Sequence, residues 1–496
     1  MKHSPRPATA CAAALVLLLA ACAVGPDFQK PAPPDVAGYT AKPIPAMTAS
    51  ADAEGGQAQR FLRGATILAD WWTLYHSKPL SDLVELALAN NSDLKAARAA
   101  LSVARENALA QRGAYYPSIS AGFSASRQQQ PGTLAPVPNN NAFQYDLFTP
   151  ELTVSYAPDV FGLNRRTVES LEAQQQAVRF QMIAIYTTLT SNVVVTAIQA
   201  ASVETQIEAT RDIIARDTEA LQILEYQAKK GYANGLDLAA QKSQLAEATA
   251  TLPPLLKQMA QLQDLLAVLV GRFPSQAPPQ TLALTDLQLP RELPLSLPST
   301  IVEQRPDVLQ AEANLHAASA QIGIAVANRL PNIQLSANAG STALAIGQLF
   351  APGTGLWTLA ASLTAPIFDG GTLMHQERAA RAGYEEAAQQ YRSTVLGAFQ
   401  NVADTLTALE QDAEALKAAS ASADAAKTTL DIAQRQVKDG YAGYLVLLNA
   451  EQAYQLARIN LVQAQASRFA DTAALFQALG GGWWNRTELV RDDHDK

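Results

Sequence analysis

The stretch PSISAGFSAS, from Pro117 to Ser126, alternates apolar and polar residues with one glycine at position 122. Period two with one polar and one apolar face is typical of a transmembrane β-strand, which meets lipid on one side and water on the other. A second alternating segment runs through Phe148–Tyr156. A soluble hairpin with one face on a core gives the same pattern, so alternation alone leaves both interpretations open.

This pattern belongs to a unit that occurs twice in the chain. Residues 91–125 match residues 305–339 at a constant offset of 214 (331 − 117). Farther on, the triplet Gly231-Tyr232-Ala233 matches Gly440-Tyr441-Ala442 at an offset of 209 (440 − 231). A period near 210 residues is too long for a solenoid and indicates a duplication of one structural unit.

The duplication supplies two more alternating segments, 332–339 and 357–364, which makes four predicted strands in one chain. Four strands cannot close a barrel, and an open edge in hydrocarbon leaves backbone groups unpaired at several kcal/mol each. Because bacterial barrels start at about eight strands, two chains are the minimum and three would give twelve. The pattern itself does not choose between these numbers.

Heptad spacing predicts long helices for most of the remaining residues. Leu238, Leu245, Leu252, Met259 and Leu266 recur every seven residues, as in a coiled-coil seam. A helix from about Arg166 to Lys229 would be roughly 95 Å long at 1.5 Å per residue. The pair Pro253-Pro254 interrupts the second run, and we expect the helix to break or restart there.

The N-terminus has the layout of a bacterial export signal. Lys2 and Arg6 precede an apolar run, Ala8–Ala20, which is shorter than the roughly 20 residues of a membrane-spanning helix. The run ends in Leu19-Ala20-Ala21-Cys22, which resembles the lipobox of lipoproteins and makes Cys22 the predicted lipid-bearing first residue. An ordinary secretory signal or a membrane-spanning helix are the alternatives. The other cysteine, Cys11, falls inside the predicted signal, so no disulfide framework is expected.

Composition and motifs exclude several classes of function. The chain has 496 residues and a formal charge of −8, or −10 (−8 − 2) once Lys2 and Arg6 are removed. Such an acidic chain is a poor candidate for binding nucleic acid. Beyond the signal we find no apolar stretch of spanning length. The five histidines are scattered, and no metal motif, nucleophile elbow or phosphate loop occurs, so we expect no catalytic residues, no metal and no enzyme.

The predicted organisation divides the chain into five parts. They are a signal peptide (1–21), an N-terminal extension (22–66), a first repeat (67–285), a second repeat (286–485) and a C-terminal tail (486–496).

A motif in the second repeat carries a family resemblance. Arg305-Pro306-Asp307-Val308, followed by Ala311-Glu312 and Leu330-Pro331, resembles a hallmark of TolC-like outer membrane factors, and more narrowly of the NodT-type efflux lipoproteins. Val24-Gly25-Pro26-Asp27-Phe28 and Trp71-Trp72 support it. The resemblance implies a mainly α fold: a homotrimer with a twelve-stranded barrel in the outer membrane, four strands from each chain, continued by a coiled-coil helical barrel into the periplasm.

The resemblance also implies a function and partners. The chain would conduct substrates passively from a periplasmic adaptor protein and an inner-membrane pump of the resistance-nodulation-division type. It would carry no cofactor beyond the lipid on Cys22, and Ala23 favours outer-membrane rather than inner-membrane lipid. The alternatives are the exit duct of an ATP-driven, type I-like secretion system and a non-conducting coiled-coil lipoprotein scaffold.

Two sets of site residues follow from the resemblance. The turns Gly231-Tyr232-Ala233 and Gly440-Tyr441-Ala442 would be the tips that meet the adaptor. Just beyond them, Asp237, Val446 and Asn449 would surround the periplasmic aperture, where related proteins carry carboxylates. Val446 and Asn449 depart from that pattern, which leaves open whether charge gates the aperture. Asp237 could equally be a solvated residue at a helix start.

Overall fold

The computed structural model describes residues 23–129, 144–278 and 282–490. Cys22, the predicted lipid-bearing residue, lies outside the described residues. The chain forms two compact units, each assembled from separate stretches of sequence. The strand unit comprises the described residues within Met1–Pro31, Leu101–Val178 and Ala311–Tyr391, and the hairpin unit comprises those within Ala32–Ala100, Arg179–Gln310 and Arg392–Lys496. Each unit contains residues of both sequence repeats, so the compact units are not the repeats themselves.

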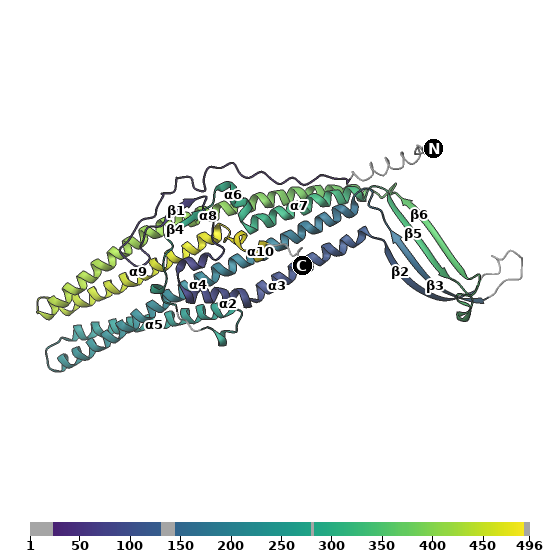
Figure 1. Cartoon of the computed structure of the whole chain (residues 1–496). Coiled ribbons are helices and arrows are strands. Elements are labelled where there is room, and N and C mark those ends of the chain that lie inside the picture. The colour runs from purple at the N-terminus through teal and green to yellow at the C-terminus, as the bar shows by residue number, and fades with distance from the viewer. Residues whose placement is uncertain (1–22, 130–143, 279–281, 491–496) are drawn as a thin grey trace. The chain divides into compact units, whose positions relative to one another are not determined.

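The strand unit contains one antiparallel sheet of four strands, and Figure 1 shows them side by side. They are β2 (Ser118–Gln129), β3 (Gln144–Tyr156), β5 (Asn332–Ser341) and β6 (Gly355–Thr364). The order is β2-β3-β5-β6, so two hairpins, one from each repeat, meet at the β3–β5 ladder. All four strands predicted from alternation are confirmed.

The helices that precede and follow these strands pack against one another through small residues. Helix α3 (Ser92–Arg112) precedes β2, and α7 (Pro306–Ala327) precedes β5, as the duplication requires. The buried side chains of this unit include Ala108, Ala173, Ala317 and Ala320. Alanine lets helix backbones approach closely and is the best intrinsic helix former. The alanine-rich composition therefore favours both helix formation and close helix packing.

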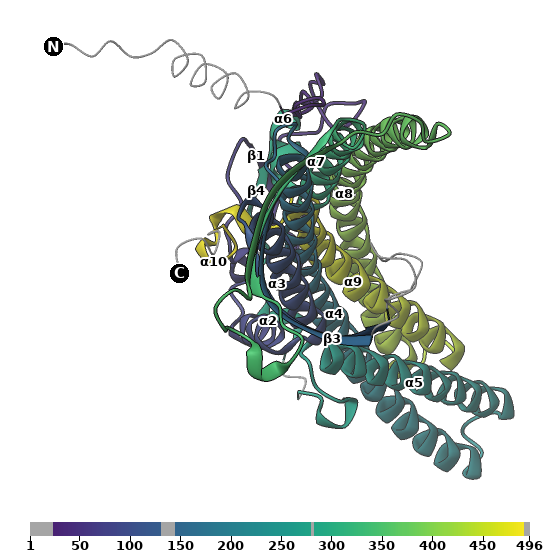
Figure 2. The same cartoon turned by 90° about the vertical axis from the view of Figure 1, so that its right-hand side faces the viewer.

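One long helical hairpin forms the second half of each repeat (Figure 2). The first joins α4 (Leu163–Lys229) to α5 (Gly235–Leu269), and the second joins α8 (Thr372–Lys438) to α9 (Tyr444–Ala478). Helices α4 and α8 both contain 67 residues, which confirms the predicted long helix. Buried apolar positions on α8 include Val402, Leu406 and Leu409, which recur at the four- and three-residue spacing of a heptad seam.

The predicted break at Pro253-Pro254 is wrong, because α5 continues through both prolines. A proline inside a helix removes the N–H that would bond the carbonyl four residues earlier, here those of Thr249 and Ala250. Thr249, Ala250 and both prolines are exposed. Water can therefore satisfy the two carbonyls, and packing of the opposite face keeps the helix continuous.

The hairpin unit has an aromatic core that the N-terminal half of the chain helps to build. A short 3-10 helix, Trp71–Tyr75, buries both tryptophans, and Trp71 stacks on Phe476 with ring centroids 5.0 Å apart. A small parallel sheet of β1 (Arg60–Arg63) and β4 (Glu292–Leu295) lies in the same unit. The short helices α2 (Lys78–Asn90), α6 (Pro298–Gln304) and α10 (Thr487–Val490) complete it.

One helix among the described residues, α4, is long and apolar enough to cross a membrane by length and composition. This corrects the expectation that no such stretch follows the signal. Two thirds of its apolar window is buried inside the protein (67%), as in the core helix of a folded unit. Length and composition alone are therefore weak evidence that α4 spans a membrane.

Candidate functional site

The register of the sheet places the alternating apolar residues of all four strands on one face. Two rows cross the sheet, Ile119–Val154–Ala337–Leu359 and Ala121–Leu152–Ala339–Trp357. The neighbouring row, Ser120–Thr153–Asn338–Thr358, lies on the other face and is polar throughout. Because side chains alternate across a strand, this register keeps one face apolar over its whole width.

The apolar face is not covered by any described part of the chain. Phe123 is 61% exposed, Leu363 68% and Trp357 80%. Arg127 and Asp146 form an ion pair at 3.8 Å on the same face, beyond Ala125. An exposed apolar band that ends in charged side chains is the arrangement expected of a lipid-facing sheet. The alternative of a soluble hairpin packed on a core does not fit it.

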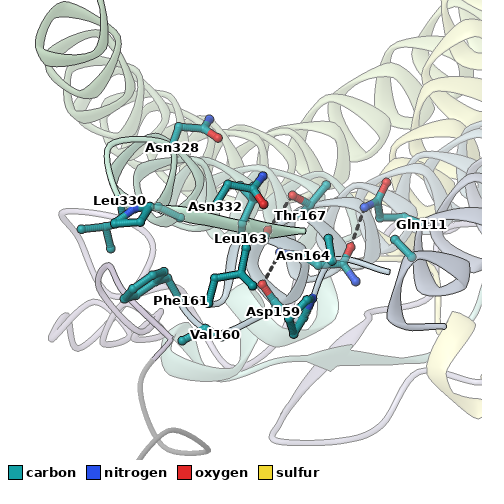
Figure 3. A pocket seen from close by; sticks show the side chains of 16 residues that line it. Gln111, Asp159, Val160, Phe161, Leu163, Asn164, Thr167, Asn328, Leu330 and Asn332 are labelled. Carbon is teal, nitrogen blue, oxygen red and sulfur yellow. Dashed lines mark hydrogen bonds between the residues drawn. The ribbon is translucent and has the colours of Figure 1, made fainter. Parts of the chain in front are cut away.

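A cavity of about 370 Å³ lies in the strand unit where strands give way to helices. Figure 3 shows Phe161 and Leu330 at one end of it and Gln111 and Asn164 at the other. The amide of Gln111 donates to the side-chain oxygen of Asn164 at 2.6 Å. Asp159 accepts hydrogen bonds from the backbone N–H groups of Asn164 and Arg165 and so caps the start of α4.

Arg166 holds the segment that follows position 22. Its guanidinium donates to the Val24 carbonyl at 3.0 Å and to Asp27 at 2.7 Å. Phe28 stacks on His316 with a centroid distance of 4.3 Å. The residues Val24–Phe28, which sequence analysis noted only through a resemblance, thus form a bound strap on the strand unit. The Arg166 side chain is almost fully buried, so its contacts with the strap are shielded from water.

Both predicted tips are tight turns between the long helices. Gly231 and Gly440 have φ angles of 80° and 79°, the left-handed geometry that glycine adopts without strain. The N–H of Tyr232 bonds the Gln227 carbonyl at 2.9 Å, five residues back, and Tyr441 repeats this toward Gln436 at 2.8 Å. These hydrogen bonds cap the C-terminal ends of α4 and α8 in the same way in both repeats.

The tip side chains are available for contact. Tyr232 is 84% exposed and Tyr441 85%. Exposed aromatic residues at a fixed turn are common anchors for protein partners. That these tips meet an adaptor stays a prediction.

The three aperture residues lie in the first turns of the return helices. The N–H of Asp237 donates to the Asn234 side chain at 2.8 Å, so this part of the chain is a capped helix start. Val446 and Asn449 are exposed on α9. A residue at a helix start can also line an aperture, so the two roles of Asp237 are compatible. That Asp237, Val446 and Asn449 surround an aperture stays a prediction.

A buried polar cluster that sequence analysis missed links the two hairpins. Tyr444 at the start of α9 donates to the Gln241 side chain at 3.0 Å, and Gln241 donates to the Asp217 carbonyl at 2.9 Å. Burial, and secondly the charge of Asp217, raise the pKa of Glu451 to about 7. The pKa of Asp217 is raised too, chiefly by burial. No local pattern marks these residues, since each sits alone in a helical sequence.

Among the described residues, no group of three histidine, cysteine or acidic side chains is arranged to hold a metal. His316 contacts Glu169 at 3.0 Å and stacks on Phe28, so its role is to hold the strap.

The chain matches the family model of the outer membrane efflux proteins over residues 83–272 and 297–481, one segment in each repeat. The chain belongs to the outer membrane efflux protein family. Among curated relatives, the pyoverdine export outer membrane protein OpmQ of Pseudomonas putida is 30% identical over 83% of this chain and 88% of its own length. The toluene efflux pump outer membrane protein TtgC of Pseudomonas putida is 28% identical over 96% of both chains.

Solved structures agree with this family. The open state of the Neisseria gonorrhoeae MtrE outer membrane channel superposes with a TM-score of 0.79 at 26% identity, covering 94% of this chain and 99% of that one. The fold is therefore TolC-like, as the sequence predicted. This outer membrane efflux protein is located in the outer membrane, extends into the periplasm and serves as a channel component of an efflux system. That is a transport role.

Proposed function

We propose that three copies of this outer membrane efflux protein form one duct and conduct substrates passively from the periplasm to the exterior. One observation carries the proposal: a four-stranded sheet with an exposed apolar face and two edges, β2 and β6, that pair on one side only among the described residues. In hydrocarbon such edges cost several kcal/mol for each unpaired group. Three copies supply twelve strands and remove every edge.

The anchor proposed for this duct is a lipid on Cys22. Val24 donates its N–H to the Phe161 carbonyl at 3.1 Å, and Arg166 binds the residues that follow. The strap would therefore hold the lipid-bearing residue close to the point where strands meet helices. Mass measurement of the N-terminal peptide tests this. Acyl chains on Cys22 are expected, and a free thiol at that position would refute the anchor.

The proposed partners are a periplasmic adaptor, which meets the tips at Tyr232 and Tyr441, and through it an inner-membrane pump of the resistance-nodulation-division type. Exposed tyrosines on rigid turns in both repeats support adaptor contact. Relatives named as efflux pump components support the pump. In the proposed aperture Asp237 would supply the charge, whereas Val446 and Asn449 would supply none.

Planar bilayer recordings test the duct directly. The purified mature protein is expected to need detergent, to sediment as three chains and to produce stepwise ion conductance. A water-soluble single chain without conductance would overturn the proposal and leave a coiled-coil scaffold as the better alternative.

A further inference from the structure

The strap Val24–Phe28 and the residue before it, Ala23, lie directly against the connection between β3 and α4. The N–H of Val24 bonds the Phe161 carbonyl at 3.1 Å. A Cβ placed on Gly162 would lie 2.7 Å from the Cα atom of Ala23, so this approach requires glycine. Gly162 also has a φ angle of 81°, which glycine adopts without strain. The first described residue of the chain is therefore fixed beside this connection.

The cavity of about 370 Å³ begins at the same connection. Its walls include Phe161 and Leu163, the two neighbours of Gly162, together with Leu330 from the connection between α7 and β5 (Figure 3). An apolar cavity of about 150 Å³ holds one benzene molecule, so by the same measure this cavity has room for roughly fifteen carbon atoms. That is the size of one fatty acyl chain.

The polar side of the cavity contains a hydrogen-bond donor without an acceptor. The side-chain oxygen of Asn164 accepts from Gln111 at 2.6 Å, whereas its buried Nδ2 atom donates to no group among the described residues. Burying an amide N–H without an acceptor is unfavourable, and a carbonyl oxygen inside the cavity would supply one. The cavity therefore suits a molecule that combines an apolar chain with an ester or amide carbonyl.

The duplication provides a second version of this connection for comparison. Ala365-Pro366, which follows β6, matches Ala157-Pro158, which follows β3. The next two residues of the second repeat, Ile367 and Phe368, are 93% and 92% exposed. Phe161 of the first repeat is only partly exposed. The two connections therefore differ where the strap is bound, and the second one serves as a matched control.

We propose that one acyl chain of the lipid on Cys22 lies in this cavity and that a carbonyl oxygen of the same lipid accepts a hydrogen bond from Asn164. This inference rests on the proposed lipid anchor and names the site that receives it. Neighbouring Cα atoms are about 3.8 Å apart, so a lipid on the residue before Ala23 starts within reach of the cavity. A membrane phospholipid offers the same chemistry, but tethering gives the lipid on Cys22 the higher effective concentration.

Photo-cross-linking in outer membranes identifies the occupant. Replacing Leu330 by p-benzoylphenylalanine places a photoreactive group in the cavity wall, and illumination should join it to the lipid of the N-terminal peptide, as read by mass spectrometry. The control carries the same group at Phe368, where membrane phospholipid should be captured and the N-terminal adduct should be about 10-fold rarer. Val160, also in the cavity wall, replaces Leu330 if that variant fails to assemble. Adding Asn164→Leu should lower the N-terminal adduct about 2- to 10-fold.

Each outcome supports or overturns one part of the proposal. Phospholipid captured at Leu330, or equal amounts of N-terminal adduct at Leu330 and Phe368, would overturn the acyl site while the lipid anchor stands. No adduct at Leu330 although Phe368 captures phospholipid would overturn it too. An unchanged yield with Asn164→Leu would remove the carbonyl contact. If the N-terminal peptide carries no acyl chain, the proposed anchor itself fails, and bilayer conductance reports separately on the duct.

Discussion

Arg166 joins the start of the described chain to α4 through three hydrogen bonds, one of them to the Asp27 carboxylate. We expect Arg166→Gln to release the strap, because hydrogen bonds to charged groups contribute about 1.5–3 kcal/mol each. The Val24 amide, bonded to Phe161, should then exchange with solvent about 10- to 100-fold faster. Hydrogen exchange measures this. Arg165→Gln, which alters only contacts with Asp159, is the control, and equal exchange in both variants would contradict the assignment.

Glu451 gives the protein a pH-dependent stability of predictable sign. Its pKa is raised from 4.5 to about 7, first by burial and then by the charge of Asp217, while Arg216 lowers it. The folded protein therefore holds this proton more tightly than the unfolded chain. The stabilising effect is complete below about pH 4.5 and is lost as the pH rises toward 7.

Glu451→Gln should remove this dependence. At pH 8 the variant should be more stable than the unmodified protein by about 1–2 kcal/mol, less than the full shift implies because some water reaches the side chain. Thermal unfolding in detergent at pH 5 and pH 8 tests it. Glu414→Gln, at an exposed position on α8, should change neither curve. A variant that keeps the original slope would show that Glu451 is not responsible.

At the scale of elements, the tip turns depend on left-handed glycines. Nothing lies within 4 Å of a Cβ placed on Gly440, so Gly440→Ala meets strain only from the backbone angle. That strain costs about 1–2 kcal/mol. The Tyr441 amide, bonded to Gln436, should exchange roughly 5- to 30-fold faster. Gly443→Ala, at a residue with φ of −76°, is the control and should change little.

Elements with a local signal could be predicted from the sequence, and those made by distant contacts could not. Alternation marks each sheet strand within its own residues, and a glycine before Tyr232 or Tyr441 marks each turn. The β1–β4 pairing has no such mark, because Arg60 and Glu292 meet only after folding. Pro253 carries a strong local signal that packing overrides.

The same distinction between local patterns and distant contacts applies to the candidate site. The tip turns and the apolar strand face were predicted, because the pattern that marks each of them lies in a continuous stretch of sequence. The Tyr444–Gln241–Asp217 link and the strap contacts of Arg166 were not, because they join positions from different repeats or distant segments. Asp217 looks like any polar residue of a long helix until its neighbours are known.

At the scale of the whole molecule, the proposed function has two separable parts: conduction, which needs the sheet and the helices, and partner contact, which we propose for the tips. Tyr232→Asp combined with Tyr441→Asp should therefore abolish efflux by cells while leaving single-channel conductance and subunit number unchanged. Both side chains are more than four-fifths exposed (84% and 85%), so the fold loses no packing.

The control for that variant is Phe273→Asp, which removes an equally accessible aromatic residue beyond the far end of α5 (76% exposed). It should keep both efflux and conductance. Drug susceptibility of cells and bilayer recordings of the purified protein supply the two measurements. Loss of conductance in the tyrosine variant would mean that the tips shape the pore itself. Normal efflux in that variant would remove Tyr232 and Tyr441 from the partner surface, because an introduced carboxylate in a desolvated contact leaves a buried charge without a partner.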